Sequence, residues 1–152
     1  MVRRSALLAL IVVLVGCGTS PPKPYRLGGY WGGVMTYGGM DSFVFVVDVT
    51  TSAEGSVSGY GLFTSDPTLE RRVWVTVTGN TQPTSVSLTL RDASNDTIQL
   101  SGNVDGSVVR GTWVYATLGM SGSFRMAAEE NVDLLGQRQP TKEPLLFSSL
   151  FE

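Results

Sequence analysis

The chain contains no histidine and only one cysteine, Cys17, among its 152 residues. Without histidine, the Ser-His-Asp and Cys-His catalytic arrangements and every histidine-containing metal site are excluded. One thiol cannot form an intrachain disulfide, so the fold must be stabilised by packing. Charge is also sparse, at 16% of the residues. No basic stretch follows the first few residues, which makes nucleic acid a poor partner.

The carboxylates do not form a convincing catalytic pair. Asp48 alternates with apolar residues in a strand pattern, which favours an outward, solvated position. Asp92, Asp96 and Asp105 lie in predicted turns, where aspartate accepts hydrogen bonds from backbone amides. The sequence therefore predicts no enzyme, with no catalytic residue, no metal site and no cofactor.

The sequence has only a short apolar run at its start. About ten apolar residues, from Ala6 to Val15, follow Arg3 and Arg4, whereas a transmembrane helix needs about 20. Basic residues before a short apolar run with a small-residue cleavage site are typical of a secretory signal peptide. We therefore expect residues 1–16 to be removed as the chain leaves the cytoplasm.

The end of this run, Leu14-Val15-Gly16-Cys17, resembles the lipobox of bacterial lipoproteins. The resemblance implies that Leu14, Val15 and Gly16 are recognised by the signal peptidase and that a diacylglycerol is attached to Cys17. Acyl chains such as palmitate would then anchor the protein to the membrane, since two or three chains bind stably. The residue after the cysteine is Gly18 rather than aspartate. By the same resemblance, this implies sorting to the outer membrane in cells that have one. A buried structural cysteine is the alternative.

Removal of residues 1–16 leaves 136 residues, a length suited to a single domain. The loss of Arg3 and Arg4 leaves 9 basic against 13 acidic side chains, a net charge of about −4. Residues 17–27 hold the cysteine and three prolines. Because proline favours extended backbone, we expect this segment to be a semi-rigid tether.

From Gly28 to Ala127 the sequence alternates apolar and polar residues between short turns rich in Gly, Asn, Asp and Ser. The predicted strands are 29–37, 42–50, 55–64, 71–78, 85–91, 97–103, 107–115 and 120–127. Their hairpin-length connections require antiparallel neighbours, and closing the sheet hides eight apolar faces and removes its edges. The sequence predicts an all-β fold, an eight-stranded antiparallel up-and-down meander barrel, followed at residues 128–152 by a tail or short helix.

The barrel domain carries a second resemblance. Gly29-Tyr30-Trp31 opens the first strand and Arg125 lies in the last, which resembles the calycin group, including lipocalins and avidins. The resemblance implies that Trp31 packs beneath Arg125 and closes one end, a cation–π contact worth roughly 0.5 to 2 kcal/mol. The lipocalin disulfide is absent, and avidin's biotin contacts have no counterpart here.

An eight-stranded barrel is either filled by its own side chains or holds one small ligand. Trp31, Trp113 and Tyr115 are the aromatic residues that we expect in the lumen. Small residues opposite them would leave a cavity: Gly59, Gly61, Gly111 and Gly122. Core packing of the three aromatic side chains is the alternative.

Two functions follow from these alternatives. In the first, a lipid-anchored, non-enzymatic envelope protein binds a small apolar or amphipathic ligand in or at the mouth of the barrel. In the second, a filled barrel acts through its surface as an envelope assembly factor or enzyme inhibitor. A lumen void of about 300 Å³ or more would favour the first.

The C-terminal segment from Leu145 to Phe151 is strongly apolar. We expect such a segment to be covered rather than to remain in water, which leaves two roles open. It docks on the barrel, or it contacts an envelope protein or the membrane.

Overall fold

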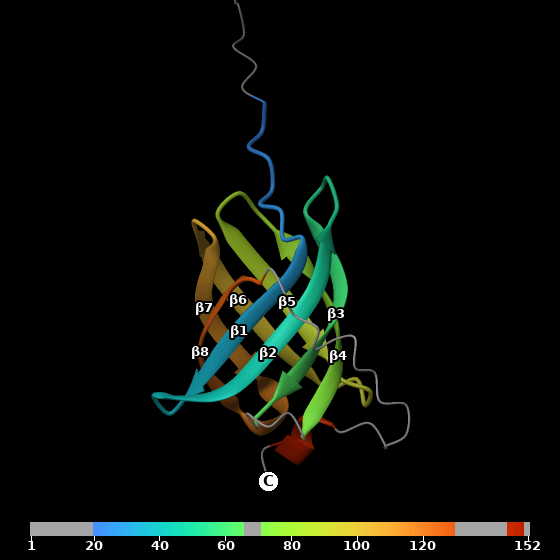
Figure 1. The fold of residues 1–152 in the computed structure, drawn as a ribbon, viewed down its shortest axis with the longest axis vertical. Coiled ribbons are helices and arrows are strands. Elements are labelled where there is room, and N and C mark those ends of the chain that lie inside the picture. The colour runs from blue at the N-terminus through green and yellow to red at the C-terminus, as the bar shows by residue number, and fades with distance from the viewer. Residues whose placement is uncertain (1–19, 66–70, 130–145, 151–152) are drawn as a thin grey trace, which may run out of the picture.

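The computed structural model describes residues 20–65, 71–129 and 146–150, which Figure 1 shows as a closed barrel. Its strands are β1 (Gly29–Tyr37), β2 (Met40–Thr51), β3 (Ser56–Thr64), β4 (Arg72–Thr81), β5 (Ser85–Arg91), β6 (Thr97–Asp105), β7 (Val108–Tyr115) and β8 (Met120–Ala128). Each strand pairs antiparallel with its neighbours in the sequence, and β8 closes the barrel by pairing with β1. The predicted all-β meander barrel is confirmed.

The strands form where apolar and polar residues alternate, and the barrel turns the apolar face inward. In β5, for example, Val86, Leu88 and Leu90 are buried and the residues between them face outward. β1 and β2 are joined by the tight turn Gly38-Gly39, with φ values of 60° and 85°. Glycine adopts these positive φ values without steric cost, as a two-residue hairpin turn requires.

The described lumen is packed with side chains along its length. Trp113, Tyr115, Phe45 and Phe63 have no solvent-accessible surface, and they belong to one continuous cluster of buried apolar residues. The rings of Phe43 and Phe63 stack with their centroids 5.4 Å apart. A void large enough for a water molecule would leave accessible surface on the side chains that line it. The barrel is therefore filled rather than hollow around these residues.

The upper end of the barrel in Figure 1 is covered by the residues that precede β1. Leu27 is fully buried, and its carbonyl accepts a hydrogen bond of 2.6 Å from Thr51 Oγ1. The Tyr25 ring packs edge-on against Trp31, with centroids 6.3 Å apart. Tyr25 and Leu27, which the sequence places in the predicted tether at residues 17–27, therefore belong to the closed end of the barrel.

The opposite end is covered by η2 (Phe147–Leu150), a short 3-10 helix drawn in red in Figure 1. Phe147 is fully buried, with its ring centroid 5.4 Å from Phe63 and 5.9 Å from Tyr115. Its backbone N–H donates a 2.9 Å hydrogen bond to Asp92 Oδ2. Phe147 thus fills the lower mouth of the barrel.

This packing bears on the two roles predicted for the terminal segment. Phe147 and Leu150 are buried against the barrel, so the docking role applies to them and they are unavailable to a partner. Leu145 and Phe151 lie outside the described residues.

The other helical element, η1 (Ala116–Leu118), is a single 3-10 turn between β7 and β8. It ends at Gly119, whose φ of 64° is left-handed. Among the described residues, no helix has the length and apolar character needed to cross a bilayer. The predicted signal peptide and Cys17 lie outside the described residues.

Candidate functional site

The three aromatic residues predicted to bind a ligand are core residues. Trp31, Trp113 and Tyr115 face the lumen and are buried. Trp113 Nε1 donates a 3.1 Å hydrogen bond to the carbonyl of Thr36 in β1. Thr36 lies five positions beyond Trp31, roughly 16 Å along the strand. The structure therefore places Trp31 near the upper end and Trp113 towards the lower one, so the three do not converge on one site.

The glycines predicted to open a cavity instead accommodate neighbouring atoms. A Cβ on Gly122 would overlap the Thr36 carbonyl oxygen and lie 2.7 Å from Trp113 Nε1. On Gly61 a Cβ would lie 2.6 Å from the backbone oxygen of Val46. The space opposite the aromatic rings is occupied, so the prediction of a cavity at these glycines is wrong.

The predicted closure of the barrel by Trp31 and Arg125 is also wrong. Arg125 lies between Phe124 and Met126, which are buried, and is itself exposed on the outer face of β8. Because successive side chains of a strand point to opposite faces, Arg125 cannot reach a tryptophan in the lumen. The upper end is closed by Leu27 and Tyr25 instead.

A cluster of hydrogen bonds around two aspartates organises the lower end. Asp92 is buried, and its Oδ1 accepts hydrogen bonds of 2.9, 2.7 and 2.9 Å from the Ser94 N–H, the Ser94 hydroxyl and the Asp96 N–H. Asp96 accepts hydrogen bonds from Tyr115 at 2.5 Å and Thr117 at 2.6 Å. The cluster joins the β5–β6 turn to the end of β7 and, through Asp92, to η2.

Two groups of this cluster, Asp96 and Tyr115, have shifted pKa values. Burial raises the pKa of Asp96, but hydrogen bonds from Thr117, Tyr115 and the Thr97 N–H outweigh it and lower the pKa from 3.8. Burial, together with the nearby Asp96 carboxylate, raises the pKa of Tyr115. A general acid or base works best with a pKa near the operating pH. These two groups are shifted away from it, which is consistent with a structural role.

We expect Asp96→Asn to lower the free energy of unfolding by about 1 kcal/mol at pH 7, because the amide accepts these hydrogen bonds less strongly than a carboxylate. A carboxyl with a lowered folded pKa stabilises the fold above its unfolded pKa and loses that effect as the pH falls through the folded value. The difference from wild type should therefore shrink below pH 3.8. Urea unfolding at pH 7 and pH 2.5 measures it.

Asp105→Asn is the control for this experiment, because Asp105 pairs with Arg110 at 3.1 Å on the exposed surface. Exposed ion pairs contribute little to stability, so no measurable change is expected at either pH. An Asp96→Asn deficit that persists unchanged at pH 2.5 would contradict the assignment.

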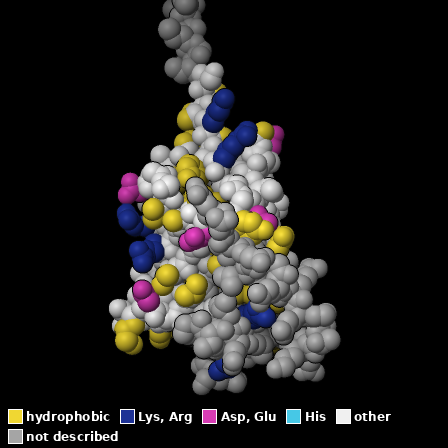
Figure 2. Space-filling view, viewed as in Figure 1, with side chains coloured by type: hydrophobic (Ala, Val, Ile, Leu, Met, Phe, Trp, Pro, Cys, Tyr) yellow, Lys and Arg dark blue, Asp and Glu magenta, His cyan; other side chains and the backbone are white. Residues whose placement is uncertain are grey.

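With the lumen filled, the outer wall is the surface left for function. Figure 2 shows one face of it, where hydrophobic side chains are scattered among polar ones. A small apolar cluster lies on the outside of β1 to β4: Tyr30, Val46, Leu62 and Trp74. Val46 and Leu62 are buried within it, so the deepest part of this cluster is already covered.

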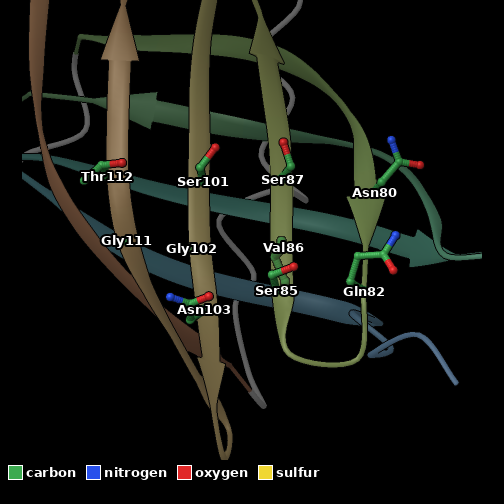
Figure 3. A pocket seen from close by; sticks show the side chains of 10 residues that line it. All are labelled: Asn80, Gln82, Ser85, Val86, Ser87, Ser101, Gly102, Asn103, Gly111 and Thr112. Carbon is green, nitrogen blue, oxygen red and sulfur yellow. The ribbon is translucent and has the colours of Figure 1, made fainter. Parts of the chain in front are cut away.

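A second feature of the outer wall crosses β4 to β7. A shallow hollow with a volume of about 590 Å³ lies there, and Figure 3 shows the polar side chains that line it in two rows. The row nearer the barrel's middle comprises Asn80, Ser87, Ser101 and Thr112, each opposite the next in the strand register. The other row comprises Gln82, Ser85 and Asn103. We call this hollow, with its two rows, the furrow.

The floor of the furrow is made by residues whose side chains point inward or are absent. Gly102 and Gly111 are directly paired in the register, and Val86 pairs with Gly102 from β5. A Cβ on Gly102 would lie 2.7 Å from the Arg110 carbonyl oxygen and 2.9 Å from the Phe124 ring. The strands therefore approach closely here, and the bare backbone lies between the two polar rows.

Comparison of the chain with protein-family models, with curated proteins and with solved structures gave no match. The functional argument therefore depends on the geometry. Among the described residues, no group of three or more potential metal-ligating side chains comes together.

Proposed function

We propose that this protein is a lipid-anchored, non-enzymatic component of the cell envelope that binds a partner through the outer surface of a solid barrel. An envelope assembly factor and an inhibitor of an exogenous enzyme both act in this way. The observation that carries the proposal is the filled lumen. The residues that would contact an internal ligand, Trp31, Trp113 and Tyr115, are already packed against the protein's own side chains.

Closure of both ends supports the same proposal. A ligand entering from above meets Leu27 and Tyr25, and one entering from below meets Phe147. Admitting a small molecule would require one of these contacts to open and a core side chain to move. Burial of a large apolar side chain contributes roughly 1.5–3 kcal/mol, which opposes both steps.

The proposed anchor also determines which end faces the membrane. Tyr25, which is docked on the barrel, lies eight positions after Cys17, and eight Cα-to-Cα steps span at most roughly 30 Å. The end closed by Leu27 would therefore stay close to the membrane, with the exposed Lys23 and Arg26 beside it. The side wall of the barrel would remain accessible to a partner.

Native mass spectrometry of the full-length acylated protein, purified from the membranes of its own host, tests the proposal. We expect the mass of the protein with its acyl chains and no additional small molecule. Tryptophan fluorescence should not change when a panel of lipids and metabolites is added. A retained molecule that is lost in Trp113→Phe would return the function to the lumen and overturn the proposal.

A further inference from the structure

The furrow is lined by neutral polar side chains. It presents three serines, one threonine, two asparagines and one glutamine, and no charged side chain, in a protein with both signs of charge on its surface. Beyond the lining, Arg110 lies opposite Asn103 in the register and is paired with Asp105 at 3.1 Å, and Arg125 lies opposite Arg110. The furrow is therefore electrically neutral and rich in hydrogen-bonding groups.

The hydrogen-bonding groups of this lining point outward to solvent. None of its seven polar side chains has a hydrogen bond to another described residue. A hydroxyl donates once and accepts twice, and a carboxamide offers two donors and one acceptor oxygen. The two rows thus offer donors and acceptors together on both sides of one hollow, in a fixed array held by the strand register.

The same lining argues against several ligand classes. A nucleic acid or an anionic headgroup needs basic side chains, and none lines the furrow. A lipid tail needs apolar surface, and Val86, the one apolar side chain there, is buried. Protein interfaces are centred on aromatic residues and arginine, and the furrow has neither. A ligand that is uncharged, polar and rich in hydroxyl groups fits what remains.

The shape favours a chain over a compact molecule. The two rows are two residues apart along the strands, roughly 7 Å, and the furrow crosses four strands, roughly 14 Å between the outer two. Figure 3 shows both rows flanking the bare strip at Gly111, Gly102 and Val86. The hollow is open to solvent along this length, so a linear molecule can lie across the strands with each flank facing one row.

We propose that the furrow binds a neutral glycan strand, with the hydroxyl and amide groups of the sugars replacing water on the two rows. This inference rests on the proposed function in one respect, namely that the outer wall is the binding surface. It goes further by naming the ligand class. The Gln82 carbonyl accepts a 3.1 Å hydrogen bond from the Tyr25 N–H, so the furrow lies at the end that the anchor would hold near the membrane.

The test uses the full-length protein in a detergent without a sugar headgroup, with chitohexaose, an uncharged N-acetylglucosamine hexamer, as the probe. We expect saturable binding by isothermal titration calorimetry. Ser87→Ala combined with Asn103→Ala removes one group from each row and should weaken binding about tenfold, since each neutral hydrogen bond contributes roughly 0.5–1.5 kcal/mol.

The matched control is Thr89→Ala combined with Gln99→Ala. Both residues lie on the same two strands as Ser87 and Asn103 and outside the furrow lining. We expect this double variant to bind chitohexaose as the wild type does. Melting curves of both variants show whether either change disturbs the fold.

Three results would overturn the inference. The first is that neither chitohexaose nor maltohexaose binds at millimolar concentration. The second is that the two double variants weaken binding equally. The third is that the furrow captures a protein partner while glycans do not bind. Each leaves the proposed function standing, because another part of the outer wall can carry it. A small molecule in the lumen would instead remove the proposed function and leave the furrow measurement unaffected.

Discussion

Replacing Trp113 by alanine is expected to lower the free energy of unfolding by about 3–5 kcal/mol. The indole has no exposed surface, meets the Phe43 ring edge-on at 6.1 Å, and donates a hydrogen bond to Thr36. Its removal leaves a cavity in the lumen. The cavity cannot collapse, because the closed barrel fixes the distance between its strands. Urea unfolding followed by circular dichroism measures the loss.

Two further variants separate packing from the hydrogen bond. Trp113→Phe keeps most of the ring volume but leaves the Thr36 carbonyl without its donor, so we expect a smaller loss, about 1–3 kcal/mol. Val114→Thr is the matched control, because Val114 follows in the same strand and faces outward. Its effect should stay within about 0.5 kcal/mol. If Trp113→Ala costs less than about 1 kcal/mol, the lumen contains a void and the filled-barrel argument fails.

Much of the fold could be predicted because it depends on local patterns. The β1 and β5 boundaries match the predicted ranges, since alternation and turn residues determine both. β2 and β4 are longer than predicted because hydrogen bonding continues into residues without alternation, at Met40 and from Gly79 to Thr81. The pairing of β8 with β1, which closes the barrel, could also be predicted, because closure covers the eight apolar strand faces.

The ends of the barrel could not be predicted in the same way. Leu27 and Phe147 reach the core through contacts with residues far away in the sequence, such as Thr51 and Asp92. No periodicity marks such contacts, so Leu27 was assigned to the tether. The misplaced Arg125 is different, because alternation with Phe124 and Met126 already put it outside. There the family resemblance conflicted with a signal that the strand itself contained.

The candidate site was missed for a reason of register. Ser87, Ser101 and Thr112 each read as an ordinary outward residue of a half-buried strand. Only the hairpin register shows that they form one row, beside the strip of inward-facing positions at Gly102 and Gly111. A pairing diagram built from turn lengths is the sequence signal that would have found the furrow.

Cys17→Ser is expected to prevent acylation completely, because the proposed diacylglycerol is attached to this thiol. Each buried methylene contributes about 0.8 kcal/mol, and a single acyl chain binds only marginally, so stable retention needs the diacylglycerol on the thiol. In a lipoprotein-competent bacterial host, the wild type should incorporate labelled palmitate and partition into detergent with the membranes. The variant should not incorporate palmitate.

Mass spectrometry of the N-terminal peptide gives the second readout, in which residues 1–16 are absent and Cys17 carries the acyl mass. Leu14→Asp should block the same processing, because Leu14 begins the box that the signal peptidase recognises. Thr19→Ala is the matched control beyond the box and should leave labelling and fractionation unchanged. Palmitate incorporation by Cys17→Ser would place the acylation elsewhere in the chain. It would also remove the constraint that holds the Leu27 end of the barrel close to the bilayer.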